Sequence, residues 1–333
     1  MSTYESLEIS WKKIVSRYQT SDVRRSLWQV VNSIIPYILL WYLMWRSLAV
    51  SYILTLLLAV PTAGFMMRIF IIFHDAGHGS FFKSQKANTL IGYITGIMTF
   101  SPYEQWRHDH AIHHATAGDL DRRGVGDVPT MTVEEWRTAP PLKRWAYRLM
   151  RNPLILFGFG QLAVFLISYR FFAPSSGRRE KWSVVWTNLA LLAIIVGMCL
   201  TIGWKAYLLI QLPIVWIGGA IGEWLFYVQH QFQGVYWVRH KDWDYLSSAM
   251  KGASYYQLPK VLQWFTGSIG FHHIHHLSPK IPNYNLERCH KENPIFHSAK
   301  KLTLWTSLHA LGLRMYDEAS GKMVGFGAIN KTT

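Results

Sequence analysis

The chain has 333 residues, of which 50% are hydrophobic and only 16% are charged, with 34 Lys and Arg against 19 Asp and Glu. The charged share is below the quarter that is typical of soluble domains, and the apolar share is too high for a disordered chain. Two cysteines cannot form a disulfide framework in a chain of this length. We therefore expect a single membrane-embedded domain over residues 1–333, partly in water because the mean hydropathy is only +0.08.

Two long apolar blocks predict four membrane-spanning helices arranged as two hairpins. The first block gives segments 27–46 and 50–73, and the second gives segments 184–203 and 206–228. Each block is too long for one helix, because about 20 helical residues cross a bilayer core. Tryptophan and tyrosine side chains fall near the ends of these segments, as in the aromatic belts of membrane proteins.

Two shorter apolar segments, 87–102 and 154–169, lie between the hairpins. The first is too short to cross a bilayer comfortably, whereas the second is nearly long enough. If either crossed alone, the histidine motifs described below would be divided between the two sides of the membrane. If both crossed, the second motif would be left outside. On the assumption that the motifs converge, we expect both segments to lie in the interface, or to dip in and return.

The basic residues predict the side of the membrane on which each region lies. Regions 1–33, 74–183 and 229–333 hold every lysine and arginine except Arg46, Arg68 and Lys205. Because positive charge marks the cytoplasmic side, we expect all three regions to be cytoplasmic. The net charge of +15 then reflects orientation and attraction to anionic headgroups rather than nucleic-acid binding. The first 13 residues lack the layout of a signal peptide.

Eleven of the fifteen histidines are gathered at four places in the predicted cytoplasmic regions. These are HDAGH (74–78), WRHDHAIHH (106–114), YVQHQF (227–232) and HHIHH (272–276). Residues three and four apart share a helix face, so the spacing predicts that each motif directs two or three imidazoles at one point. By the same spacing, His108 and His273 point away from that face.

Converging imidazoles predict a metal site. Neutral imidazole suits iron, copper, zinc or nickel, and eight or nine of them exceed the needs of one ion, so we expect two ions. A zinc hydrolase would show HExxH, but the sequence contains no His-Glu pair. A metal transporter would place ligands inside the spans, where Glu223 is the only carboxylate. The remaining interpretation is a redox site, normally iron, that activates O₂ at the membrane surface beside a lipid substrate.

The sequence resembles the integral-membrane fatty acid desaturases over nearly its whole length. HDAGHGSF, the HxxHH within WRHDHAIHH and the HxxHH within HHIHHLSPKIPNYNL are similar to the three histidine boxes of that family. IFIIFHDAGHGSFF, DLDRRGVGD, FYVQHQF and LQWFTGSIGFHHIHHLSP are most similar to bacterial acyl-lipid desaturases of the Δ5/Δ12 type. One departure is Gln233-Gly234, which stands where relatives often have an acidic pair.

The resemblance implies a non-haem di-iron centre that uses O₂ and two electrons to insert a cis double bond into an acyl chain. It implies eight box ligands and a ninth after the fourth span: His74, His78, His110, His113, His114, His230, His272, His275 and His276. No catalytic residue is expected beyond these ligands. Candidates for orienting or surrounding them are Asp75, Asp109, His108 and His273. The charged segment DLDRRGVGD (119–127) is predicted to be a solvated loop, and Glu223 has no assigned role.

We therefore expect an all-α integral-membrane fold: four transmembrane helices as two hairpins, interfacial helices and a cytoplasmic helical cap that carries the histidine boxes. Both termini would be cytoplasmic, in a multi-pass protein of the bacterial plasma membrane. The expected substrate is a phospholipid-linked acyl chain, and the expected electron donor is an acidic carrier such as ferredoxin or flavodoxin. A related di-iron lipid hydroxylase, a carotenoid ketolase and, in another class, a histidine-rich metal carrier are the alternatives.

Overall fold

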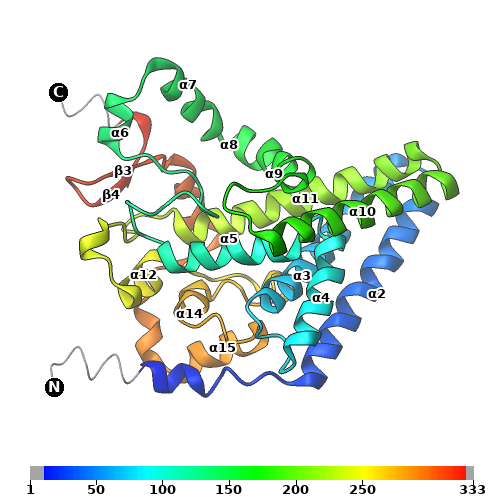
Figure 1. Cartoon of the computed structure of the whole chain (residues 1–333), viewed down its shortest axis with the longest axis horizontal. Coiled ribbons are helices and arrows are strands. Elements are labelled where there is room, and N and C mark those ends of the chain that lie inside the picture. Colours follow the sequence, from blue (N-terminus) through cyan, green and yellow to red (C-terminus); the bar gives the residue numbers. More distant parts are fainter. Residues whose placement is uncertain (1–10, 328–333) are drawn as a thin grey trace.

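Four long helices form an arm that extends to the right in Figure 1, and shorter elements form a cap at the opposite end. The computed structural model describes residues 11–327. The prediction that the first 13 residues are not a signal peptide therefore concerns a region that lies mostly outside the described residues. The long helices are α2 (Val23–Ser47), α3 (Tyr52–Gly77), α10 (Arg178–Thr201) and α11 (Trp204–His230). They overlap the four segments that hydropathy selects.

Local sequence explains where these helices begin and turn. The Asp22 side chain accepts hydrogen bonds from the backbone N–H groups of Arg24 and Arg25, which caps the start of α2. Gly203 has a positive φ of 85° in the turn between α10 and α11, a conformation that glycine adopts readily. Helix α3 has 26 residues and so a length of about 39 Å. This length exceeds the roughly 30 Å of a bilayer core, and the last turn of the helix carries His74.

Five stretches of the described chain are long and apolar enough to cross a membrane, one more than the four predicted spans. The fifth is Pro153–Arg170, which overlaps the segment that we expected to stay on one side. It is broken into α8 (Pro153–Ile155), a π-helical turn η1 (Leu156–Gly160), α9 (Gln161–Leu166) and η2 (Ser168–Arg170). The other short apolar segment forms α4 (Gln85–Met98), whose 14 residues extend about 21 Å.

The cap is mostly helical, as expected, but it also contains two small two-stranded sheets. Strand β1 (Tyr255–Tyr256) pairs in parallel with β2 (Lys301–Leu302), and β3 (Met315–Asp317) pairs antiparallel with β4 (Lys322–Val324). The all-α expectation therefore describes the long helices but not the whole cap. The cap helices are α5 (Tyr103–Thr116), α6 (Val133–Thr138), α7 (Pro141–Met150), η3 (His240–Asp242), α12 (Tyr245–Gly252), α13 (Lys260–Phe265), α14 (His272–Leu277), α15 (Asn283–Glu292), η4 (Pro294–Ser298), α16 (Leu304–Ser307) and η5 (Leu308–Gly312).

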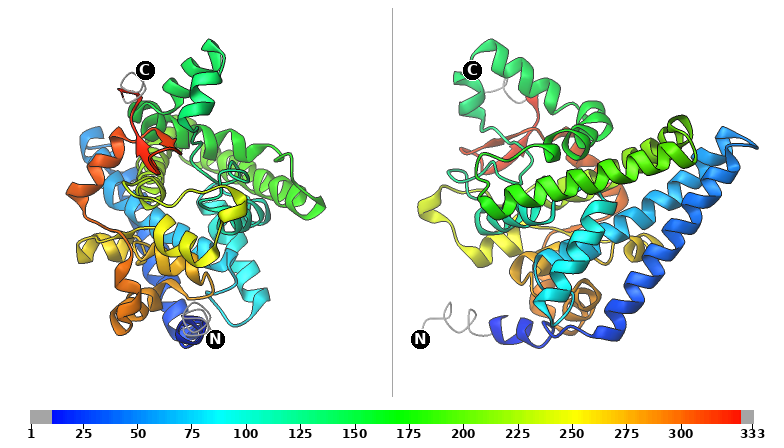
Figure 2. Two further views of the ribbon diagram at one scale, coloured as in Figure 1. Left: turned by 90° about the vertical axis from the view of Figure 1, so that its left-hand side faces the viewer. Right: turned by 45° about the vertical axis from the view of Figure 1, so that its right-hand side comes forward.

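The protein interior is concentrated where the long helices enter the cap. The largest buried cluster joins the end of α11, including Tyr227 and Val228, to Ile274 of α14 and Leu286 of α15. By contrast, α10 exposes most of its apolar side chains, with Leu200 at 82%, as a lipid-facing helix does. Both views in Figure 2 place the first described residues and the C-terminal strands at opposite ends of the molecule. The cap core therefore holds together segments from the whole length of the chain.

Candidate metal centre

Nine histidines from four helices meet at the junction between the long helices and the cap. Helix α3 supplies His74, and His78 directly follows it as the C-cap residue. Helix α11 ends on His230, at the same junction. The remaining six lie on the two cap helices α5 and α14: His110, His113, His114, His272, His275 and His276. The structure thus brings together all nine residues that the sequence marks as ligands.

The ligand nitrogens of these residues form two separate groups. Within each group the donor atoms all lie within 4.8 Å of one another. The first group contains His74, His78, His110, His114 and His275. The second contains His113, His230, His272 and His276. The groups adjoin, because the rings of His114 and His276 stack with centroids 4.2 Å apart.

Two of the histidine motifs supply both groups, which corrects the expectation that each motif directs its imidazoles at one point. Helix α5 gives the i,i+4 pair His110 and His114 to the first group and His113 to the second. Helix α14 does the reverse, giving His272 and His276 to the second group and His275 to the first. Residues four apart point the same way, but the residue at i+3 is rotated far enough to face the neighbouring group.

Neighbouring imidazoles face one another through their Nε2 atoms. In the first group, His114 Nε2 lies 3.2 Å from that of His110 and 3.0 Å from that of His275. In the second, His230 Nε2 lies 2.9 Å from that of His272 and 3.3 Å from that of His113. Two ligands that each lie about 2 Å from a shared ion at right angles are separated by about 3 Å. These spacings therefore fit nitrogens arranged around common ions.

Burial favours the uncharged form of five of these histidines. Desolvation, followed by repulsion between neighbouring imidazoles, lowers the pKa of His110, His114, His272, His275 and His276 well below 6.5. Neutral imidazole is the form that binds metal. The Nε2 atom of His78 is buried and has no hydrogen-bond partner in the described part of the chain. A donor set that consists of imidazoles, most of them buried, with such an unpartnered nitrogen fits metal ions that favour nitrogen ligands.

Two carboxylates contact histidines of the two groups, one in each group. Asp75 Oδ1 lies 3.1 Å from His74 Nδ1, while Asp75 Oδ2 accepts hydrogen bonds from the backbone N–H and the side-chain amide of Asn283. Asp127 Oδ1 lies 2.6 Å from His113 Nδ1. Such contacts fix the tautomer and the rotation of a ligating imidazole. Asp75 is therefore placed as the sequence suggested, whereas Asp127 is a residue that sequence reasoning left in a charged loop.

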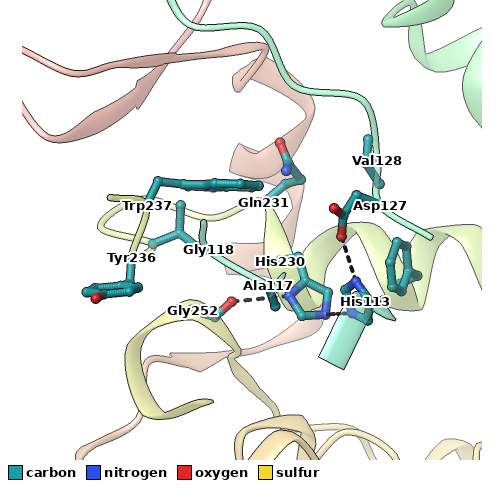
Figure 3. A pocket seen from close by; sticks show the side chains of 12 residues that line it. His113, Ala117, Gly118, Asp127, Val128, His230, Gln231, Tyr236, Trp237 and Gly252 are labelled. Atoms are coloured by element: carbon teal, nitrogen blue, oxygen red, sulfur yellow. Dashed lines mark hydrogen bonds and ion pairs between the residues drawn. The ribbon is translucent and has the colours of Figure 1, made fainter. Parts of the chain in front are cut away.

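Figure 3 shows the surroundings of the second group on the cap side. Asp127 reaches His113 from above, His113 faces His230, and the Nδ1 atom of His230 points at the backbone carbonyl of Gly252, 3.2 Å away (Figure 3). The Gly252 carbonyl can only accept, so it selects the His230 tautomer that carries its proton on Nδ1. That tautomer leaves Nε2 of His230 free to bind an ion.

The segment 119–127 is a partly exposed loop that ion pairs tie to its surroundings. Asp119 is completely buried and contacts Arg122 and His240 at 2.6 Å and 2.8 Å. Asp121 forms an ion pair with Arg239. The prediction of a solvated loop thus holds for the exposed Asp121 and Arg122 but not for Asp119; these contacts also tie down the loop that carries Asp127. The resemblance of DLDRRGVGD to the family was the only sequence signal for this role.

The remaining candidates lie outside both groups. His108 is half-buried on α5, and Asp109 faces a cavity without contacting a ligand imidazole. His273 is fully buried but packs against the rings of Tyr255 and His290, at 6.1 Å and 5.3 Å between centroids. The helical spacing that turned His108 and His273 away from the ligand face therefore agrees with their positions.

A cavity of about 480 Å³ opens onto both histidine groups. His74 and His110 of the first group and His272 of the second line one end of it. Most of the wall is apolar and comes from α3, the broken segment 153–170 and α11; it includes Met66, Phe70, Leu156, Val164, Phe165, Gly218 and Gly222. Glu223 also lines the cavity and accepts a hydrogen bond from Gln161 across it. The cavity is suited to an apolar ligand next to the metal-binding side chains.

Comparison with known proteins agrees with this arrangement. The model of the fatty acid desaturase family matches residues 49–306. A fatty acid desaturase of Bacillus subtilis (strain 168) is 48% identical over 317 residues, which is 95% of this chain and 90% of that protein. An sn-1 acyl-lipid omega-3 desaturase (ferredoxin) of Nostoc sp. (strain 36) is 30% identical over 72% of this chain and 68% of its own length. An sn-1 oleoyl-lipid 12-desaturase of Synechocystis sp. is 28% identical over 76% of this chain and 70% of its own length.

Proposed function

The chain belongs to the fatty acid desaturase family of oxidoreductases, and we propose that it inserts a cis double bond into an acyl chain of a membrane lipid. The overall reaction would consume one O₂, two electrons and two protons, remove one hydrogen from each of two neighbouring carbons, and release two waters. The observation that carries this proposal is the apolar cavity of about 480 Å³ that reaches both histidine groups. An acyl chain in this cavity would lie next to both metal sites.

We infer that the nine histidines hold two iron ions, one in each group. Iron held there would supply the redox chemistry that activates O₂ towards an unactivated carbon–hydrogen bond. The donor chemistry supports this, because both groups consist entirely of histidine among the described residues. Asp75 and Asp127 would keep His74 and His113 in the orientation and tautomer that binding requires.

Aromatic side chains would separate the reacting site from water. The Trp106 ring stacks on His110 with centroids 4.3 Å apart, and Phe226 packs against both His113 and His230 at 5.1 Å. Both aromatic residues also line the cavity. An acyl chain bound there would be held between these rings and the imidazoles, so its position along the cavity would select the carbon pair that reacts.

We propose four membrane spans, with α4 and the segment 153–170 returning to the side that they leave. Contacts at both ends of 153–170 support this topology. Before the segment, Arg151 donates hydrogen bonds to Gln231 and to the backbone of Leu313 in the cap. After it, the backbone N–H of Ala173 donates to Gln105 of α5, the helix that carries the second histidine motif. A chain that returns to the cap enters the membrane without crossing it.

The location, lipid substrate and electron donor are further parts of the proposal. The basic residues of the cap and positive-inside topology support a cytoplasmic site and cytoplasmic termini, in a bacterial plasma membrane. The names of the Nostoc and Synechocystis relatives specify acyl-lipid and oleoyl-lipid substrates, which supports a phospholipid-linked acyl chain here. The Nostoc name also specifies ferredoxin, and a basic surface suits an acidic carrier of the ferredoxin or flavodoxin type.

The proposed function is tested by expression in a host that lacks its own desaturase. Gas chromatography of the lipids should show a new unsaturated fatty acid, and His113→Ala should abolish it. The matched control is His309→Ala, because His309 is exposed, belongs to neither histidine group and has its Nδ1 atom 3.1 Å from the backbone carbonyl of Thr306. An acyl chain with an added oxygen would indicate a hydroxylase instead. Metal uptake without any lipid product would indicate a metal carrier.

A further inference from the structure

Helix α7 presents an apolar face that the described part of the chain leaves uncovered. Leu142, Trp145 and Leu149 are 75%, 62% and 43% exposed. Their spacing of three and four residues places them on one side of the helix. The other side is fixed to the cap by Tyr147, which is buried and donates a hydrogen bond to the backbone carbonyl of Arg314. The helix is therefore held firmly with three large apolar side chains pointing outwards.

Basic residues border this apolar face. On a helical wheel, Arg148 lies next to Trp145 at one margin, about 60° away, whereas Lys143 lies about 100° beyond Leu142 and Arg144 about 100° beyond Trp145. None of the three forms an ion pair with a carboxylate of the described residues 11–327. Arg148 instead lies over the rings of Trp136 and Phe326, at 5.4 Å and 5.2 Å, which holds its charge at the helix edge. An apolar stripe with Trp and Leu bordered by Lys and Arg is typical of helices that lie in the headgroup region of a bilayer.

The position of α7 in the fold identifies what covers it. The chain passes from α7 through α8 to α9, which lies beside the long helix α11 (Figure 1). Leu154 and Phe159, on this path, are 78% and 61% exposed. The exposed apolar surface therefore continues from α7 into a stretch that is apolar enough to enter a membrane. A surface that continues into the bilayer in this way is covered by the same bilayer.

We propose that α7 lies in the headgroup layer of the leaflet next to the metal centre and binds anionic phospholipids. Leu142, Trp145 and Leu149 insert among the acyl chains, and Lys143, Arg144 and Arg148 contact lipid phosphates with their side-chain stems along the apolar boundary. The last residue of α7, Met150, lines the 480 Å³ cavity. Lipid contact at α7 thus fixes how deep in the membrane one wall of that cavity lies.

The lipid contact can be measured without any enzymatic turnover, so its result is independent of the proposed desaturase activity. An environment-sensitive fluorophore is attached at Trp145→Cys in a Cys199→Ala background, because the other cysteine, Cys289, is fully buried. The full chain is placed in nanodiscs containing lipids that carry a nitroxide near the headgroup. The matched control carries the label at Lys241→Cys, an exposed position in η3 of the cap.

We expect strong quenching of the label at position 145 and little at position 241. Quenching at 145 should increase from phosphatidylcholine to phosphatidylglycerol nanodiscs, and Lys143→Gln with Arg144→Gln and Arg148→Gln should remove that increase. An unquenched label at 145 in both lipids would overturn the proposal. A label that is shielded from water but not quenched would mean that a second copy or another protein covers α7, which also overturns it. Equal quenching in both lipids would overturn the preference for anionic lipid.

Discussion

Asp127 Oδ1 lies 2.6 Å from the Nδ1 atom of His113, a ligand candidate of the second histidine group. The other carboxylate oxygen accepts a hydrogen bond from the backbone N–H of Gly124. Burial alone would raise the pKa of Asp127, but the hydrogen bond and the charge interaction with His113 lower it. The carboxylate therefore stays ionised and keeps the proton of His113 on Nδ1, which leaves Nε2 available to an ion.

Replacing this carboxylate should weaken the second group without removing a ligand. We expect Asp127→Asn to lower desaturation about 10- to 100-fold, the usual cost of losing a partner that orients a metal ligand. Bound iron should fall in parallel, as measured by elemental analysis of the purified protein. Asp121→Asn is the matched control, because Asp121 lies in the same segment but pairs with Arg239 away from the histidines. Equal losses in both variants would show that the loop, not the contact with His113, matters.

Helices α5 and α14 each supply histidines to both groups. This division predicts which metal ion each substitution should remove. His275→Ala takes a donor from the first group, although its neighbour His276 belongs to the second. We expect both His275→Ala and His276→Ala to abolish desaturation. Each should also lower the iron content from near two towards one per chain. The double variant should hold less iron than either single variant. A double variant that retains as much iron as each single one would mean that both residues serve the same ion.

Arg151 should contribute strongly to stability. It is fully buried and donates hydrogen bonds to Pro129, Tyr227, Gln231 and Leu313, which joins four segments of the chain. Arg151→Met would leave several buried acceptors without donors, at a cost of about 1–3 kcal/mol for each group left unpaired. A clearly lower unfolding temperature in detergent is expected. Lys241→Met, at an exposed site, should leave the unfolding temperature unchanged, and a similar fall in both variants would refute the role of Arg151.

Glu287 should make the cap less stable in acid. Partial burial would raise its pKa, but hydrogen bonds from Lys260, Lys291 and Gln263 lower it to about 2. A carboxyl group whose pKa is lowered by folding stabilises the protein above its ordinary pKa and loses that effect as the pH falls towards 2. Glu287→Gln should therefore lower the unfolding temperature at pH 7, and its difference from the unchanged protein should shrink as the pH falls from about 5 towards 3.

A suitable control for this effect is Glu318→Gln, whose carboxylate pairs with Arg239 at the surface. Surface pairs contribute little to stability, so this variant should stay close to the unchanged protein at every pH. A Glu287→Gln difference that is constant across the pH range would contradict the assignment of a lowered pKa.

The sequence predicts the parts of the fold that depend on local pattern. Hydropathy locates the ends of the long helices to within about six residues, and i,i+4 spacing selects His110 with His114 and His272 with His276. Spacing within one helix does not reveal that His113 and His275 each belong to a different group from the other ligand candidates on the same helix. That assignment depends on how α5 and α14 pack in the folded protein. Asp127 was assigned to a solvated loop for the same reason. Its partner, His113, is 14 residues away, and no helical register connects them.

The broken segment Pro153–Arg170 shows the limit of hydropathy. Its composition suits a span, and composition carries no information about where the flanking residues bind. Arg151 before it and Ala173 after it both bond to the cap, and these are tertiary contacts. The contact between Glu223 and Gln161 was equally hidden, because only folding brings the two residues together.

The division of α14 between the two groups has a consequence for biosynthesis. Each group combines residues from the first half of the chain with at least one residue of α14, near residue 275. Neither group can therefore be completed before the ribosome has passed α14, late in the second half of the protein. Asp75 adds to this delay, because its partner Asn283 is made later still. Loading of the proposed iron ions would therefore wait for α14, and a truncated chain that ends before α14 would lack residues of both groups.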